Sequence, residues 1–253
     1  MKIRATFFTS LFTGISLYAC EISDSKERSV TIINNTDQIA DSTMKLGGFD
    51  WTVDPLIVSI DEENLSSSIG RDDLESIRQH VYNYFHLQQT GDIKEFKQHF
   101  RYYPKISSQD TNMIKMIEEG TMKWWSAGYR NCYKSVDINY ASDWIEDGNK
   151  KVTLIGFDLL FEGEYSSIYQ GNPSGTVDAM RREVSNSSVE YLEDGDMRKI
   201  VVKASKGLFV ISHHDEESYR FYPEHNANNN GLDAMISRDV RLKLLRTKRD
   251  SQK

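Results

Sequence analysis

The sequence predicts an α+β domain in which helices come first along the chain and antiparallel strands follow. Between residues 72 and 125, apolar side chains recur at the spacing of one helical face. Between residues 136 and 222, apolar and polar side chains alternate, and short turn sequences separate the runs. This order favours helices packed on one face of an antiparallel sheet. Apolar residues make up 38% of the 253 residues, which is enough for a sizeable core.

The first 20 residues have the pattern of an export signal. Two basic residues precede an uncharged apolar stretch of about 15 residues, which is short for a membrane-spanning helix but typical of a signal peptide. Leu17, Ala19 and Cys20 resemble the cleavage box of bacterial lipoproteins. We therefore expect residues 1–19 to be a signal peptide and Cys20 to carry a lipid. The alternative is an ordinary secretory signal with an incidental cysteine.

The segment that follows is expected to be a tether. Residues 20–48 are rich in Ser, Asp, Asn and Thr and carry few large apolar side chains. The free energy gained by burying so little apolar surface would not offset the conformational entropy lost on ordering the segment. Residues 49–60 then alternate around Pro55, which indicates an extended segment laid against the domain. With the lipid at Cys20, the protein is expected in a bacterial cell envelope, at the outer membrane or the periplasmic face, with the leaflet left open.

Three helices are predicted next. The first opens with two acidic residues at 72 and 73, which suit a helix N-terminus, and "TGD" at 90–92 ends it. Asp92 is expected to cap a short second helix, and the third opens near Thr111. Their apolar faces carry Leu74, Ile77, Val81, Tyr84 and Phe85 in the first helix, Ile93, Phe96 and Phe100 in the second, and Met113, Ile114, Ile117, Trp124 and Trp125 in the third.

The strands come after the helices. Residues 136–140 alternate, and "EDG" at 146–148 predicts a turn into a long strand at 151–165 that is apolar on both faces. "EDGD" at 193–196 predicts a second turn. This turn joins strand patterns at 187–192 and 197–205, and "KG" at 206–207 predicts a boundary before further strand patterns at 208–214 and 218–223.

The C-terminal tail differs from the rest of the chain. "NANNNG" at 226–231 predicts a flexible break, and residues 233–253 hold seven basic and three acidic side chains. Met235, Ile236, Val240, Leu244 and Leu245 predict a short amphipathic helix. We interpret it as a solvated terminal helix, the usual role of a charge run, with a basic contact for cell wall, acidic partner or lipid headgroups as the alternative. The α+β domain is thus expected over 49–225, and the tail over 226–253.

One stretch resembles a known superfamily. "VYNYFHLQQTGDIKEFKQHFRYYPKI" at 81–106 is similar to the start of nuclear-transport-factor-2-like proteins, where a helix ends in "GD" and a second short helix carries apolar side chains at the places of Phe96 and Phe100. The resemblance implies three helices on a strongly bent antiparallel sheet that closes a cone-shaped pocket. Because this superfamily has no invariant catalytic signature, the resemblance bears on fold more than on activity.

Composition excludes several functions. The net charge of −7 argues against nucleic acid, which needs a basic face. There is no "GxSxG", no Gly-rich phosphate loop and no "HExxH", so no cofactor is expected. With Cys20 lipidated, Cys132 has no partner for a disulfide.

Asp158 is the weak candidate for a catalytic group. It lies on one strand face with Val152, Leu154, Gly156 and Leu160, where a carboxylate must be either paired or functional. In the cone fold that the sequence resembles, such a carboxylate acts as an acid or base in isomerases and cyclases. The structural alternative is an Asp at a bulge or sheet rim, bonded to the backbone or paired with Arg181, Arg182 or Lys203.

Aromatic side chains and one charged turn supply the other candidates. Tyr82, His86, Tyr103, Trp124 and Trp125 are candidates for a ligand pocket, with core packing as the alternative. His213, Asp215 and His225 are the weak candidates for a metal site. Since adjacent strand residues point to opposite faces, His213 and His214 cannot both join Asp215, and we expect solvated charges and no metal.

Together these patterns predict an exported lipoprotein with a non-enzymatic module that binds a small molecule or a protein. The membrane, through the lipid, is the expected partner, with an envelope protein or a second copy of the chain as further partners. The alternatives are a cone-fold isomerase, cyclase or hydrolase that uses a pocket carboxylate, and a structural subunit of an envelope complex.

Overall fold

A computed structural model describes most of the chain from residue 43 onward. The described residues are 43–46, 49–52, 55–61, 65–67, 69–103, 110–173, 177, 181, 187–194, 197–217, 219–224 and 235–251. The predicted signal peptide, Cys20 and His225 lie outside the described residues, as do most of the predicted tether and the break at 226–231.

The helices lie where apolar periodicity predicts them. Helix α1 ends before Gly91, which has a positive φ of 71°, and the Asp92 side chain accepts hydrogen bonds from the backbone N–H groups of Lys94 and Glu95. These contacts fix the sharp turn between the first two helices. The helical elements are α1 (Arg71–Gln89), α2 (Ile93–Gln98), the 3-10 helix η1 (His99–Tyr102), α3 (Asp110–Ser126) and α5 (Arg238–Ser251).

A single open sheet of eight strands forms the other part of the α+β fold, which the sequence predicted correctly. Its central path runs β10-β9-β7-β5-β3, while β4 pairs with β5, β6 with β7 and β8 with β9. The strands are β3 (Ile57–Ile60), β4 (Ser66–Ser67), β5 (Tyr129–Ala141), β6 (Ile145–Glu146), β7 (Lys150–Tyr165), β8 (Ser187–Asp194), β9 (Met197–His213) and β10 (Tyr219–Pro223).

The sheet is mixed, so the prediction of an antiparallel sheet is wrong at one edge. Strands β3 and β4 pair with β5 in parallel, with Val58 opposite Val136. Parallel neighbours need a long crossover connection, and here α1, α2 and α3 lie between β3 and β5 in the chain and supply it. Residues 57–60 of the predicted extended segment therefore form an edge strand.

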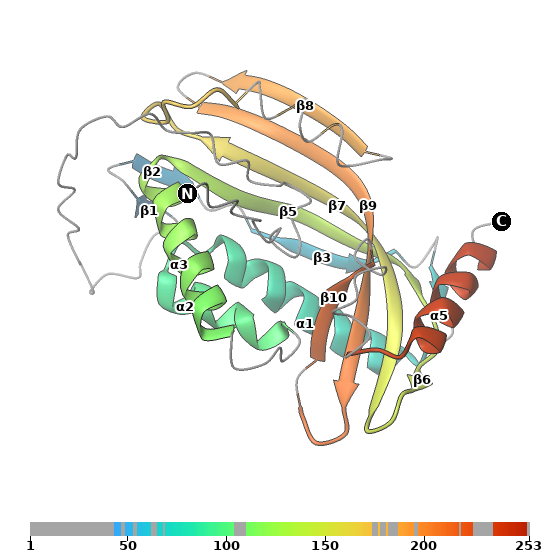
Figure 1. Cartoon of the computed structure of the whole chain (residues 1–253). Coiled ribbons are helices and arrows are strands. Elements are labelled where there is room, and N and C mark those ends of the chain that lie inside the picture. Colours follow the sequence, from blue (N-terminus) through green and yellow to red (C-terminus); the bar gives the residue numbers. More distant parts are fainter. Residues whose placement is uncertain are drawn as a thin grey trace, which may run out of the picture.

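The long strands curve around the helices, and the sheet carries a core on each face. Figure 1 shows α1, α2 and α3 inside the bend of β5, β7 and β9, with α5 on the outer side. Register shifts in β5, between Tyr133 and Ser135 and between Ile138 and Tyr140, are irregularities that bend a strand. On the inner face, α1 packs its apolar stripe against the alternate residues Ile155 and Phe157 of β7.

The outer core corrects the interpretation of the tail as a solvated helix. Val240 and Leu244 of α5 are buried against Val152 and Leu154 of β7 and Phe209 of β9. The amphipathic helix exists, but its apolar face has a partner because β7 is apolar on both faces. The tail is thus packed on the sheet through the buried side chains of Ile236, Val240 and Leu244.

Two facing glycines bring α5 close to the sheet. Gly156 of β7 lies opposite Gly207 of β9. Strand β9 continues without a break through residues 206–207, where the sequence predicted a boundary between two strands. A β-carbon at Gly207 would overlap the Glu224 carboxylate. That carboxylate accepts a hydrogen bond of 2.5 Å from Lys248 Nζ, which fastens α5 over the glycine pair.

A hairpin occupies part of the predicted tether. Strand β1 (Thr43–Leu46) pairs antiparallel with β2 (Phe49–Thr52), so residues 43–46 belong to a strand and the prediction of disorder is wrong there. The residues between the two strands in the sequence are Gly47 and Gly48, a pair that favours two-residue hairpin connections.

Candidate functional site

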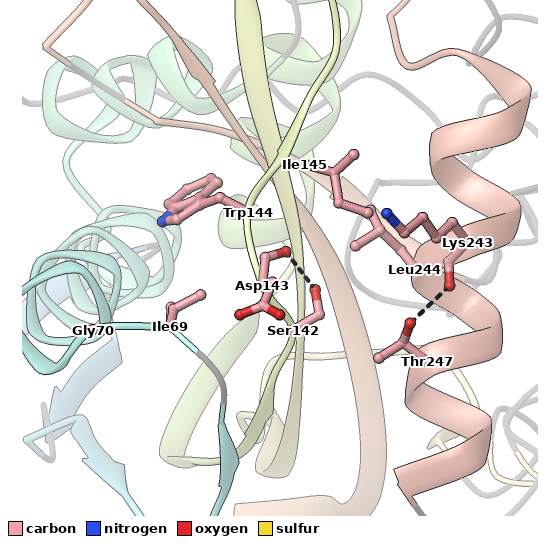
Figure 2. A pocket seen from close by; sticks show the side chains of 9 residues that line it. All are labelled: Ile69, Gly70, Ser142, Asp143, Trp144, Ile145, Lys243, Leu244 and Thr247. Atoms are coloured by element: carbon pink, nitrogen blue, oxygen red, sulfur yellow. Dashed lines mark hydrogen bonds between the residues drawn. The ribbon is translucent and has the colours of Figure 1, made fainter.

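A pocket of about 510 Å³ opens between three segments that are far apart in the sequence. One wall is the start of α1, the second is the bend that joins β5 to β6, and the third is α5 (Figure 2). Its volume is in the range of small-molecule sites. The lining residues are Ile69, Gly70, Ser142, Asp143, Trp144, Ile145, Lys243, Leu244 and Thr247.

The bend after β5 is fixed to β7 by a hydroxyl pair. Ser142 is 2% exposed, and its Oγ accepts a hydrogen bond of 3.0 Å from the Leu154 backbone N–H. The Thr153 hydroxyl lies 3.0 Å from the same oxygen and donates to the Ser142 carbonyl at 2.6 Å. Because these groups are buried and satisfied, the bend holds one conformation and presents Asp143 to the pocket.

Trp144 ties this bend to α1. Its indole Nε1–H donates to Asp73 Oδ2 at 2.9 Å, and Figure 2 shows the ring extending toward the start of that helix. Lys151 lies 4.4 Å above the ring centroid and 3.9 Å from Asp73 Oδ1. A cation over the ring and a carboxylate at the indole N–H hold the Trp144 side chain from two sides.

The third wall is attached at both ends of α5. Ahead of the helix, the Ser237 backbone N–H donates to Asp147 Oδ2 at 2.9 Å, and Lys150 lies 3.8 Å from the same oxygen. Near the other end, Lys248 pairs with Glu224. The pocket walls are therefore joined by specific polar contacts in addition to the packing of Leu244 and Ile145 in the outer core.

The pocket combines an apolar body with two opposite charges. Ile69, Trp144 and Ile145 are partly exposed and supply the apolar surface, whereas Asp143 and Lys243 are exposed. Behind the wall, burial raises the pKa of Tyr140, and the nearby carboxylates of Glu224 and Asp143 raise it further. That phenol stays neutral, so the charge at the pocket comes from Asp143 and Lys243.

Asp158 does not line this pocket. Its carboxylate is exposed and accepts hydrogen bonds from Asn139 Nδ2 at 3.0 Å and from Ser205 Oγ at 2.5 Å. Lys248, near the end of α5, lies beside Gly156, two residues before Asp158 in β7. The partners of the Asp158 carboxylate are an amide and a hydroxyl from neighbouring strands, whereas Arg181 donates to the Val189 carbonyl and Arg182 lies outside the described residues.

The aromatic candidates do not form a single cluster, although Trp125 and Tyr103 are linked through Phe96 and His99. Tyr82 stacks on His86 with ring centroids 5.3 Å apart, and both lie on α1. Trp124 packs on Tyr129 at 5.3 Å, whereas Trp125 packs on Phe96 at 5.7 Å. The structure therefore does not bring them together in one ligand pocket.

Tyr103 belongs to the same cluster as Trp125, because Phe96 contacts both Trp125 and His99, and the buried His99 contacts Tyr103. The Tyr103 hydroxyl lies 3.2 Å from His99 Nε2. Burial raises the pKa of Tyr103 to about 12 and lowers the pKa of His99 to about 4. Both groups stay neutral near neutral pH, as expected of core residues.

The metal candidates are not gathered by the described part of the chain. His213 ends β9 and Asp215 follows in an exposed turn, while His225 lies outside the described residues. The neighbouring His214 is not part of such a set, because its Nε2 lies 3.3 Å from Glu146 Oε2. Among the described residues, no three His, Cys, Asp or Glu side chains are close enough together to hold a metal ion.

Comparisons with protein-family models, curated proteins and solved structures found no match for this chain. No helix within the described ranges has the length and apolarity to cross a membrane. The pocket residues were missed in the sequence, apart from Leu244, which the amphipathic pattern of the tail singled out. The others lie in three short segments that carry no shared pattern.

Proposed function

We propose that the protein is a non-enzymatic binding module whose ligand site is the pocket between α1, the 142–145 bend and α5. The observation that carries this proposal is that the elements forming all three walls are held by specific contacts, Trp144–Asp73, Ser237–Asp147 and Lys248–Glu224. A pocket held in this way needs no rearrangement to accept a ligand, so little binding free energy is spent on ordering it. The enzyme alternative has no comparable support, because Asp158 is exposed to water.

A small neutral amphiphile tests the pocket itself. We expect para-methylbenzyl alcohol to change the fluorescence of Trp144 saturably, with a dissociation constant on the order of 1 mM for so small a ligand. Trp144→Phe should remove the signal while calorimetry still detects binding. Thr247→Phe, which fills the pocket from α5, should weaken binding by about tenfold or more, as a blocked site requires.

Arg246→Phe is the matched control, since Arg246 is the exposed neighbour of Thr247 on α5 and does not line the pocket. It should leave binding unchanged. The proposal is wrong if neither the alcohol nor its charged analogues described below bind saturably. Equal binding by the Thr247→Phe and Arg246→Phe variants would also contradict it.

We further propose that the sheet and its helices form a cone of the nuclear-transport-factor-2-like type. Support comes from the order of the elements, from the "GD" turn at Gly91 and Asp92, and from the curvature of β7 and β9 around α1 (Figure 1). The parallel edge at β3 and the outer helix α5 are additions to the cone that the sequence resemblance implies.

Location is the third part of the proposal: the module is exported and held at a bacterial membrane by a lipid on Cys20. The basis is the sequence box at Leu17, Ala19 and Cys20. In a bacterial host, we expect labelled palmitate to be incorporated into the chain, and Cys20→Ala or globomycin to abolish the label. Cys132→Ala should keep it, because Cys132 is 3% exposed within the fold. Membrane partition unchanged by Cys20→Ala would refute the anchor.

A further inference from the structure

We infer that the pocket takes a small dipolar molecule, a zwitterion whose cationic group binds at Asp143 and whose anionic group binds at Lys243. This inference rests on the proposed function of the pocket and names the class of its ligand. The two charges come from opposite walls, Asp143 from the bend after β5 and Lys243 from α5. In Figure 2 the Asp143 carboxylate faces Ile69 across the space, and the Lys243 side chain reaches from α5 toward Ile145.

Other charged groups around the opening are already engaged. Asp73 accepts from Trp144 and lies near Lys151, and Asp147 accepts from Ser237 and lies near Lys150. On α5, Lys248 is paired with Glu224. These contacts satisfy the neighbouring carboxylates and ammonium groups inside the protein, so they offer little to a ligand.

Asp143 and Lys243 differ from these neighbours. Both are exposed, and within the described ranges neither charged group makes a hydrogen bond or an ion pair. A ligand that brings one charge of each sign would satisfy both without displacing an existing contact. A simple cation or a simple anion would satisfy only one of them and leave the other to water.

The start of α1 is a competing place for the anionic end of a ligand. Gly70 caps this helix without a side-chain hydrogen bond, and free backbone N–H groups at a helix start attract anions. However, Asp72 and Asp73 already place two negative charges in the first turn. Their charge offsets the helix dipole, which leaves Lys243 as the attractive group for an anion.

The apolar lining of the pocket fits an apolar spacer. Ile69, Trp144 and Ile145 line the same pocket as the two charged groups and supply aliphatic and aromatic contact surface. A ligand of this class therefore has an amine and an acid group at opposite ends of an apolar body. Each charged end of the ligand then binds a side chain of opposite charge, so the protein backbone need not contribute to this recognition.

A matched series of four para-substituted benzenes separates the contributions of the two charges. The zwitterion is para-(aminomethyl)benzoate, the cation is para-methylbenzylamine, the anion is para-methylbenzoate and the neutral reference is para-methylbenzyl alcohol. Each is titrated into the full chain by calorimetry at low salt. We expect the zwitterion to bind about threefold to fivefold tighter than either singly charged compound, which is the size of effect that exposed ion pairs produce.

Substitutions at Asp143 and at Lys243 show which charged end of the ligand binds at each side chain. Asp143→Asn should weaken the amine and the zwitterion about threefold and leave the anion unaffected, while Lys243→Gln should do the same for the anion and the zwitterion and spare the amine. Lys203→Gln, an exposed site on β9 outside the pocket, is the matched control and should change nothing. Exchanging the two charges, with Asp143→Lys and Lys243→Asp together, should restore zwitterion binding in the reverse orientation.

The outcomes distinguish the two proposals. If the neutral alcohol binds as tightly as the zwitterion, or if the single-site variants have the same effect as Lys203→Gln, the dipolar ligand is refuted while the pocket stands as a binding site. If none of the four compounds binds, both the ligand class and the proposed function fail.

Discussion

Replacing Arg130 by alanine should lower the free energy of unfolding by about 3 kcal/mol, since it leaves a buried carboxylate without its main partner. Arg130 of β5 and Glu164 of β7 are directly opposite each other in the register. The guanidinium Nε and one terminal nitrogen each lie 2.6 Å from Glu164 Oε2. The two side chains are only 4% and 3% exposed, so water cannot replace the lost partner.

The expected loss is at the low end for a buried pair because other cations lie near. Lys199 Nζ is 3.5 Å and Lys134 Nζ 3.9 Å from Glu164 Oε1. Burial by itself would lower the pKa of Lys199, but the carboxylates of Glu164 and Glu162 outweigh it and hold that pKa above its usual value. Lys199 therefore stays charged and keeps part of the attraction when Arg130 is removed.

Two controls make the measurement specific. Replacing both partners by apolar residues, with Arg130→Met and Glu164→Leu together, should recover most of the loss, because no buried charge is left unpaired. Lys115→Ala breaks an exposed pair with Glu119, 73% and 66% exposed, and should cost less than about 0.5 kcal/mol. Urea unfolding of the four proteins measures these differences. Equal losses for Arg130→Ala and Lys115→Ala would contradict the buried pair.

Local sequence patterns were sufficient to predict the elements whose ends or faces are marked by specific residues. The first two helices could be predicted because their stripes are bounded by the glycine at 91 and by Asp92, whose side chain caps the next helix. The long strand β7 could be predicted because it is apolar on both faces. In each case residues that are adjacent in the sequence determine the local structure, so a short stretch of sequence is enough to predict it.

Strand direction and long-range pairing could not be predicted in the same way. Nothing within residues 57–60 decides whether they run parallel or antiparallel to β5; the crossover through the helices decides it. Likewise, the boundary expected at 206–207 is absent because Gly207 is not a turn residue here. It lies within β9, where the missing β-carbon leaves room for Glu224 and Lys248.

The candidate site was the least predictable part, for a related reason. The aromatic residues were the conspicuous ones, yet they divide among clusters such as Trp125 with Phe96 and Trp124 with Tyr129. The pocket instead forms where the start of α1, the bend after β5 and α5 meet. None of these three segments has a sequence pattern that predicts a site. The pocket forms only once α5 packs on the outer face of the sheet, and the sequence of no single segment shows that contact.

Two leucines of α5 provide the sharpest test of that packing. Leu244 is 1% exposed and contacts the outer core, whereas Leu242, two residues away on the same helix, is 41% exposed. We expect Leu244→Ala to lower the free energy of unfolding by about 2–5 kcal/mol, because it leaves a cavity between α5 and β7. Leu242→Ala, which has the same effect on helix propensity, should change it by no more than about 0.5 kcal/mol.

The comparison separates a packed helix from a solvated one. If the tail were solvated, both substitutions would act on a surface helix and their effects would be equally small. Because α5 also forms one wall of the pocket, Leu244→Ala should weaken probe binding, while Leu242→Ala should leave it unchanged. Chemical unfolding and probe titration of the same two variants therefore test the packing and the pocket together. Equal stability in both variants would refute the docked helix, and with it the third wall of the site.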